Sequence, residues 1–277
     1  MARVHAGAIR PLVQKVNLWS DEAAARLIPM KSGFGQFCPV AVACEVFAER
    51  WTPIILRELF AGSEHFNQIH RGIPLISRAL LARRLRDLEA AGVISREALP
   101  GERAHRYRLT EAGKEFRPVI EALGTWGQRW TVRVQPNNLD AGFLMWNIRR
   151  RIARELLPER RVLVCFSFRS VPASYRGACV FWLLLEREQV ELCVEDPGFE
   201  VDIEVEAELA AMAGVWLGDI SFDAAVRSGA IRLSGQRVLT RAFPAWLMLS
   251  HFARVPRPQP TLHAAPTPPA RNTPLAL

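Results

Sequence analysis

One segment of this 277-residue chain constrains the fold more than any other: fourteen residues after Ser77 contain neither Gly nor Pro and lead to Gly92. Serine is a favoured helix N-cap, and glycine favours the position just past a helix end. At about 100° per residue, Leu81, Leu85 and Leu88 fall on one narrow face. The pattern predicts a helix that buries these three leucines in a hydrophobic core.

The opposite face of the predicted helix carries Arg83 and Arg86, flanked by Ala79 and Ala90. Small alanines allow a helix to approach a polyanion closely, and Arg78 at the helix N-terminus suits a phosphate contact. An ordinary solvated arginine face is the alternative. The charge distribution favours an anionic partner, because the net charge is +8 and most of the excess lies in the first 135 residues, which hold 20 basic and 13 acidic ones.

Shorter helices are predicted upstream, and a β-hairpin is predicted downstream. The helices cover Ala41 to Phe47, Pro53 to Ala61 and Phe66 to Arg71. The hairpin strands, Val93 to Ala98 and His105 to Leu109, flank a Leu-Pro-Gly-Glu turn. This order of elements is typical of a winged helix-turn-helix domain, whose second helix enters the major groove of double-stranded DNA.

The return strand of the hairpin alternates between apolar and basic residues. Tyr107 and Leu109 should pack inward, while Arg106 and Arg108 face outward and Arg103 lies at the tip of the wing. The candidate DNA-binding residues are Ser77, Arg78, Ala79, Arg83, Arg86, Arg103, Arg106 and Arg108.

Thr110 is predicted to cap a last helix that is more apolar than a small domain needs, with Pro118 near its start or at a bend. Dimerisation is the expected use of this surface, and completion of a monomer core is the alternative. The candidate dimerisation residues are Phe116, Ile120, Leu123, Trp126 and Trp130.

Several motifs between Phe37 and Trp130 form an ordered series: Cys-Pro-Val at 38–40, Glu-Arg-Trp-Thr-Pro-Ile-Ile-Leu-Arg-Glu-Leu at 49–59, Leu-Leu-Ala-Arg-Arg-Leu at 80–85, Tyr-Arg-Leu-Thr-Glu-Ala-Gly at 107–113, and Trp-Gly at 126–127. The series resembles the HxlR-type winged-helix transcriptional regulators. The resemblance implies a homodimer that binds operator DNA. Arg106 departs from the family pattern, in which an acidic residue often precedes the Tyr.

Cys38 stands where some members of that family carry a thiol that senses oxidants or electrophiles. Sensing would need a lowered thiol pKa and access to solvent, and a small buried apolar residue is the alternative. The five cysteines are odd in number and lack CxxC spacing, so a disulfide framework and a zinc site are not expected. Free thiols and the absence of a secretory leader or a membrane-length apolar run indicate a soluble cytoplasmic protein.

The second half combines helical and strand patterns. Leu144, Ile148, Ile152 and Leu156 recur every four residues, which predicts an amphipathic helix. Its other side carries arginines, a face that could reach DNA or a membrane surface or simply be solvated: Arg149, Arg150, Arg151 and Arg154. Strand-like runs then precede further helices, which predicts an α+β layer with a mainly antiparallel sheet.

The order of residues from Phe222 to Leu247, with Ser-Gly at 228–229 and Arg-Ala-Phe-Pro-Ala-Trp-Leu at 241–247, resembles the end of sterol-carrier-protein-like lipid-binding domains. The resemblance implies a pocket for a small hydrophobic ligand between the sheet and the C-terminal helices. A packed core without a pocket is the alternative. The candidate lining residues are Trp182, Trp216, Phe222, Phe243 and Trp246.

The expected organisation is an N-terminal arm over 1–36, a winged helix-turn-helix domain over 37–135, a sterol-carrier-protein-like domain over 138–254 and a Pro-rich disordered tail over 255–277. Met30 is a second candidate for the translation start. Motifs of hydrolases, phosphate-binding loops, dinucleotide sites and zinc proteases are missing, so neither an enzyme nor a cofactor is expected. Two functions remain: a ligand-responsive transcriptional regulator, or a carrier of lipids or apolar metabolites whose winged helix serves only for dimerisation.

Overall fold

The computed structural model describes residues 33–98, 105–131, 135 and 139–257. The expected wing turn with Arg103, Met30, most of the arm and most of the Pro-rich tail lie outside these residues. In the first half the elements are α2 (Pro39–Phe47), α3 (Thr52–Phe60), α4 (Phe66–Arg71), α5 (Arg78–Ala90), β1 (Ile94–Ala98), β2 (His105–Leu109), α6 (Glu111–Lys114) and α7 (Arg117–Trp130).

The helix predicted after Ser77 is confirmed as α5. The Ser77 hydroxyl accepts a hydrogen bond from the Leu80 backbone N–H at 3.3 Å, which caps the helix. Leu81, Leu85 and Leu88 are buried in a cluster that also takes residues from α3, α4 and β1. Burial of one such leucine stabilises a fold by about 1.5 to 3 kcal/mol, so this face fixes the orientation of α5.

The hairpin is also confirmed, but the helix predicted after Thr110 is divided in two. β1 and β2 pair in antiparallel fashion, and Thr110 caps only the short helix α6 by accepting from Gly113 at 3.1 Å. A second helix, α7, begins at Arg117 and has Pro118 in its first turn. The division has a physical cause, because Pro118 has no N–H for a helical bond to the preceding turn.

The second half contains α8 (Ala141–Arg149), a 3-10 turn (Arg154–Leu156), β3 (Val162–Arg169), β4 (Val180–Leu185), β5 (Val190–Cys193), β6 (Ile203–Glu208), α9 (Leu209–Leu217), α10 (Phe222–Arg227), β7 (Ile231–Gly235) and α11 (Arg237–Trp246). The five strands lie in the order β5-β4-β3-β6-β7. β3 and β6 pair in parallel, and the other pairings are antiparallel. The α+β class is confirmed, with a mixed sheet.

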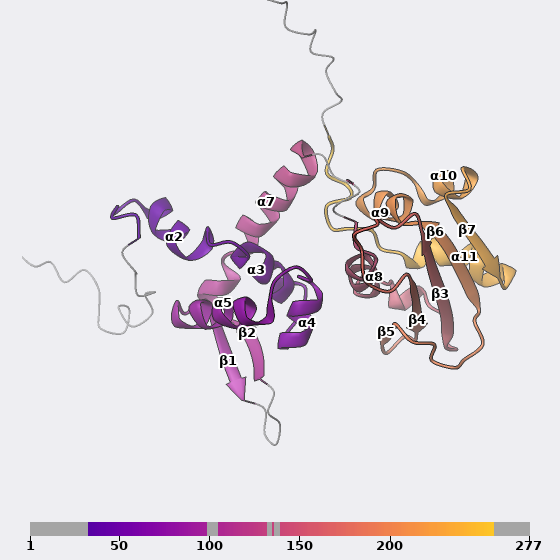
Figure 1. The fold of residues 1–277 in the computed structure, drawn as a ribbon, viewed down its shortest axis with the longest axis horizontal. Helices are drawn as coiled ribbons and strands as arrows, with labels where there is room; N and C mark the ends of the chain where they lie inside the picture. The colour runs from indigo at the N-terminus through magenta and orange to yellow at the C-terminus, as the bar shows by residue number, and fades with distance from the viewer. Residues whose placement is uncertain (1–32, 99–104, 132–134, 136–138, 258–277) are drawn as a thin grey trace, which may run out of the picture.

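One face of this sheet packs against the helices of the second half (Figure 1). Val164, Phe166 and Phe168 of β3 alternate inward and share a buried cluster with residues of α8, α9, α10 and α11. Ile203 and Val205 of β6 join the same cluster, as their alternation with acidic residues predicts. The first and second halves therefore have separate hydrophobic cores.

The prediction of one helix from Leu144 to Leu156 is wrong. α8 ends at Arg149, Leu156 is 54% exposed, and Leu157 is buried in its place. The cause is backbone pairing with the segment after α11: the Ala153 N–H donates to the Trp246 carbonyl at 2.9 Å. Residues paired in this way cannot continue helical hydrogen bonds.

The arginines of this segment do not share one helix face, because α8 ends at Arg149. Arg149 donates to the Val190 carbonyl and Arg151 to the Leu249 carbonyl. Arg154 donates to the Glu188 carbonyl, and Arg150 reaches Glu58 in the first half. All four side chains therefore join segments that are distant in sequence.

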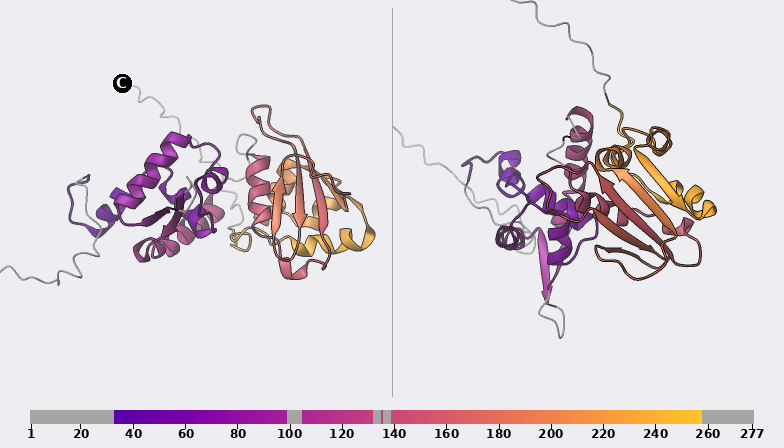
Figure 2. Two further views of the ribbon diagram at one scale, coloured as in Figure 1. Left: turned by 90° about the horizontal axis from the view of Figure 1, so that it is seen from below. Right: turned by 45° about the vertical axis from the view of Figure 1, so that its right-hand side comes forward.

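Two separate sets of contacts join the halves, which lie side by side with α8 facing the winged helix (Figures 1 and 2). The Arg150 guanidinium lies 2.8 Å from the buried Glu58 carboxylate of α3. The Gln128 amide of α7 donates to the Leu217 carbonyl at 3.0 Å. No helix within the described ranges is both long and apolar enough to span a bilayer.

Candidate nucleic-acid interface

The outward face of α5 is free of the second half of the chain. Ala79, Arg83, Arg86 and Ala90 are all exposed, and the Arg83 side chain is 70% exposed. The Arg83 Nε atom lies 3.9 Å from Asp87 Oδ2 one turn along the same helix. An exposed pair of this kind contributes little to stability, so Arg83 can exchange Asp87 for another acceptor at small cost.

The N-terminus of α5 is tied to α4. The Arg78 guanidinium donates to the Asn67 side-chain oxygen at 3.0 Å and lies over the Phe66 ring at 5.7 Å. The Ser77 oxygen is already engaged as the helix cap, although the residue is exposed. Arg78 is thus positioned where the two helices of the helix-turn-helix meet, and its remaining donors are open to solvent.

The arginines of β2 converge on a carboxylate that the sequence patterns did not single out. Glu64, just before α4, lies 3.3 Å from Arg106 Nε and 3.6 Å from Arg108 Nε. Arg108 also lies 3.8 Å from Glu97 of β1. These contacts fix the base of the wing against the helix-turn-helix and partly neutralise its positive charge.

Tyr107 sits between these arginines and points to the other face of the strand. It packs against the core of the first half, and its backbone N–H donates to the Glu64 carbonyl at 2.7 Å. Burial raises the pKa of the Tyr107 hydroxyl, and the nearby Arg96 opposes this shift. Of the two arginines predicted to face outward, Arg108 is exposed, whereas Arg106 is half-buried beside Glu64.

The apolar residues of α7 divide between the core and the surface. Phe116, just before the helix, stacks on Phe47 with ring centroids 5.4 Å apart, and Ile120 packs against the same core. The remaining apolar side chains of the helix form an exposed stripe, called here the α7 stripe: Val119, Leu123, Trp126 and Trp130. On the opposite side of α7, two residues contact the second half of the chain: the ring of Phe252 lies against Gly124, and the Gln128 amide donates to the Leu217 carbonyl.

Helix α2 stands away from the body of the first half, and none of its residues is buried (Figure 1). Phe37 and Val40 at its start are largely exposed. Together with the α7 stripe, this gives the single chain two apolar surfaces that no other described residue covers. Surfaces of this kind mark sites of protein contact.

Cys38 is exposed immediately before the first turn of α2. The backbone N–H groups of Ala41 and Val40 at the start of the helix lower the pKa of its thiol, because N–H donors at a helix start favour the thiolate. The sequence left a small buried residue as the alternative, and the structure places this thiol at the surface.

In the second half, most of the aromatic residues named as pocket candidates form one cluster. Phe243 is fully buried, and its ring centroid lies 6.0 Å from that of Trp246 and 6.1 Å from that of Phe222. Trp216 is half-buried against the same core. Trp182 does not join them: it pairs with Cys165 across the sheet, on the face away from the helices.

Comparison with known proteins adds to this geometry. A sequence model described as HxlR-like helix-turn-helix matches residues 46–135. The HTH-type transcriptional regulator YvaP of Bacillus subtilis is 31% identical over 107 residues, which cover 38% of this chain and 96% of that protein. An HTH-type transcriptional regulator of Methanothermobacter thermautotrophicus is 38% identical over 94 residues, covering 34% of this chain and 72% of that protein.

Among solved structures, the reduced form of the transcriptional regulator YodB from Bacillus subtilis is 30% identical, covers 36% of this chain and 100% of its own, and has a TM-score of 0.31. The matched residues of the family model include α3 to α7, the elements that build the helix-turn-helix and its wing. Since nearly the whole of YvaP aligns with the first half at 31% identity, the chain belongs to the HxlR-like helix-turn-helix family.

Proposed function

We propose that this protein is a transcriptional regulator that binds double-stranded operator DNA in the cytoplasm through α5 and the β1–β2 wing. One observation carries the proposal: α5 buries its leucines and leaves Arg83 and Arg86 exposed on the other side. The basic excess of the first half supports it, because phosphate neutralisation supplies much of the affinity for DNA.

The candidate residues fall into two groups, those proposed to contact base edges and those proposed to contact phosphates. Ser77, Arg83 and Arg86 are proposed to contact base edges, since arginine binds guanine with two hydrogen bonds in the major groove. Ala79 allows close approach of the helix. Phosphate contacts are assigned to the remaining arginines: Arg78, Arg103, Arg106 and Arg108.

A homodimer is proposed to form through the α7 stripe, with α2 contributing. Two copies related by a two-fold axis would place their α5 helices about 34 Å apart, one turn of DNA, on a pseudo-palindromic operator. The support is the exposure of Leu123, Trp126 and Trp130 in the single chain, since large aromatic side chains are favoured at interfaces.

The domains are proposed to cover 37–135 and 138–254, and the second is proposed to be sterol-carrier-protein-like and to bind a small hydrophobic ligand. The cluster of Trp216, Phe222, Phe243 and Trp246 supports an apolar interior. Such a ligand would change DNA affinity only if it bound the DNA-competent and incompetent dimers with different affinity.

The test is to recover genomic fragments retained by the purified full chain and to measure their affinity against random DNA at equal salt. A specific regulator should prefer its operator by about a thousandfold or more at physiological salt. The same binding should weaken steeply as salt rises. Equal affinity for recovered and random fragments would reject the regulator and favour a carrier with a winged helix used for dimerisation.

A further inference from the structure

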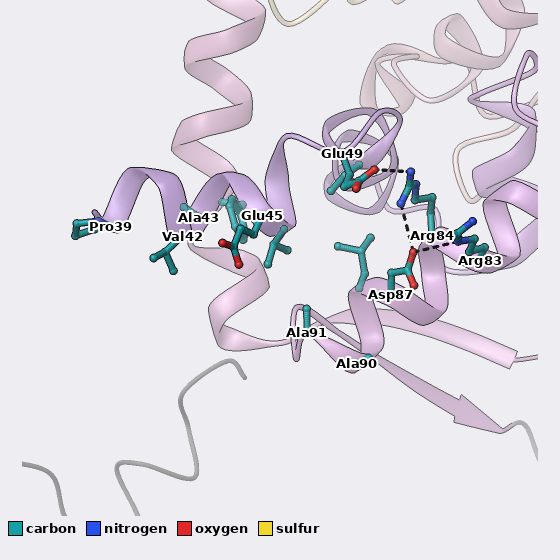
Figure 3. Close-up of a pocket in the computed structure, with 14 residues that line it drawn as sticks. Pro39, Val42, Ala43, Glu45, Glu49, Arg83, Arg84, Asp87, Ala90 and Ala91 are labelled. Carbon is teal, nitrogen blue, oxygen red and sulfur yellow. Dashed lines mark hydrogen bonds and ion pairs between the residues drawn. The ribbon is translucent and has the colours of Figure 1, made fainter. Parts of the chain in front are cut away.

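A cavity of about 560 Å³ lies between α2, α3 and α5 in the first half of the chain (Figure 3). Its volume falls within the range of roughly 300 to 1,000 Å³ that is usual for small-molecule sites. Apolar side chains from three segments form much of the wall, among them Val42 and Val46 of α2, Leu88 of α5, and Phe116. The cavity lies outside the aromatic cluster of the second half, where the sequence placed a ligand.

The charged groups at this cavity leave an excess of one negative charge. Three carboxylates, those of Glu45, Glu49 and Asp87, line it together with the guanidinium groups of Arg83 and Arg84. Arg84 lies 2.5 Å from Glu49 and 3.4 Å from Asp87, and Arg83 approaches the same Asp87 oxygen. Both guanidinium groups are thus engaged with Glu49 and Asp87.

Glu45 is the carboxylate without a cationic partner among the described residues. Its Oε1 atom accepts hydrogen bonds from the backbone N–H groups of Gly33 and Phe34, at 3.0 and 3.1 Å. Its Oε2 atom is buried and has no hydrogen-bond partner in the part of the chain that the structure describes. Figure 3 shows this side chain extending downward from α2, on the side of the helix where Ala91 lies. A buried anionic oxygen without a partner favours a cation beside it.

We propose that this cavity binds an apolar organic cation whose charge pairs with Glu45. The apolar wall would take up the hydrocarbon part of the ligand, and the net negative charge would select cations over anions of the same shape.

The cavity also shares a helix with the proposed DNA interface. Arg83 and Asp87 line it from α5, and Arg83 is the leading candidate for base contact. A ligand whose charge pairs with Glu45 would fill the cavity against Arg83 and Asp87, and would so change the contact between these two side chains before the protein meets DNA. This coupling rests on the proposed function, whereas ligand binding does not, and the two are measured separately.

The experiment uses the full chain without DNA and two probes of matched shape and opposite charge, tetraphenylphosphonium and tetraphenylborate, in isothermal titration calorimetry. The cation should bind saturably and at least about tenfold more tightly than the anion, a difference of about 1.4 kcal/mol. Absence of saturable cation binding, or equal binding of both probes, would overturn the proposal.

Two variants locate the site. Glu45→Gln keeps an oxygen for the N–H groups of Gly33 and Phe34 but removes the charge, so cation affinity should fall about tenfold. Ala43→Phe should block the cavity without changing its charge and also weaken binding. Glu195→Gln, an exposed carboxylate of the second half, is the matched control and should bind as the unmodified chain does. Unchanged affinity in both cavity variants would place the cation elsewhere and reject the assignment.

Discussion

Among single residues, Arg83 provides the sharpest test of DNA recognition. It is exposed on α5 and only loosely held by Asp87, at 3.9 Å. Arg83→Ala should weaken operator binding by about 1 to 3 kcal/mol and relax the sequence preference at one base pair. Fluorescence anisotropy at constant salt, with the operator and with single-base variants of it, measures both effects.

A matched control for Arg83 is Arg241→Ala, which removes an exposed arginine from α11 in the second half. It should leave operator binding nearly unchanged. If Arg83→Ala weakened binding equally on every sequence, Arg83 would contact phosphate and not a base edge, because phosphate contacts carry no direct sequence information.

Cys38 should be the thiol most easily alkylated in the native chain. It is exposed and its pKa is lowered by backbone N–H donors, whereas burial raises the pKa values of Cys165 and Cys193. At any pH below the ordinary thiol pKa of about 8.5, Cys38 should therefore carry a larger thiolate fraction than Cys165 or Cys193. Iodoacetamide labelling across a pH series, mapped by mass spectrometry, should modify Cys38 first.

Unfolding in denaturant is the control for Cys38, because it should make all thiols react alike. Equal rates for Cys38 and Cys165 in the native chain would contradict the expectation. A reactive Cys38 is a condition for the sensing of oxidants that the family resemblance suggests, and sensing further requires that Cys38→Ser abolish the response of operator binding to peroxide or quinones.

For single residues, the sequence predicted which side chains are buried, but it did not predict which polar side chains pair with one another. The leucines of α5 follow from helical period alone, since every third or fourth residue shares a face. The pairing of Arg78 with Asn67 and of Arg106 with Glu64 depends on how α4 approaches α5 and the hairpin. That approach is set by tertiary packing, so no local pattern could reveal it.

At the scale of elements, helix α7 should hold the dimer together. The α7 stripe is exposed, with Trp126 61% and Trp130 60% accessible in the single chain. Trp126→Glu should shift the protein from dimer to monomer, since an interface would have to bury an unpaired charge. Size-exclusion chromatography with light scattering measures the mass, and loss of the dimer should also weaken operator binding.

Glu121→Ala is the control for the α7 stripe, because this exposed residue lies on the side of α7 away from Trp126. It should remain dimeric. If Trp126→Glu left the mass unchanged, either the dimer interface would lie elsewhere or the unmodified chain would itself be a monomer.

Most helices and strands could be predicted from caps and periodicity. The wrong prediction of a helix as far as Leu156 has a tertiary cause. Ser77 caps α5 as predicted, and Ser221 caps α10 in the same way. In the sequence Leu156 continues the four-residue spacing of Leu144, Ile148 and Ile152. In the structure Ile152 pairs with Leu247, so the chain is no longer helical there. A pairing between segments so distant in sequence overrides local periodicity, which is a tertiary effect that pattern reasoning does not contain.

At the scale of the whole molecule, Glu58 and Arg150 join the two halves. Glu58 is fully buried, the Arg150 side chain is 13% exposed, and two hydrogen bonds of 2.8 and 3.3 Å connect them. Arg57 lies 2.9 Å from the same carboxylate. The sequence placed Arg150 on a basic helix face, because nothing local links it to a residue 92 positions away.

Arg150→Ala should therefore destabilise the full chain by about 3 kcal/mol, because it leaves a buried carboxylate with fewer compensating charges. Arg57 still faces Glu58, which keeps the loss from being larger. Urea unfolding followed by circular dichroism measures the change in the free energy of unfolding. Arg154→Ala, which removes an exposed arginine bonded to the Glu188 carbonyl, is the control and should change stability by no more than about 0.5 kcal/mol. Equal losses in the two variants would mean that the Glu58–Arg150 pair does not hold the halves together.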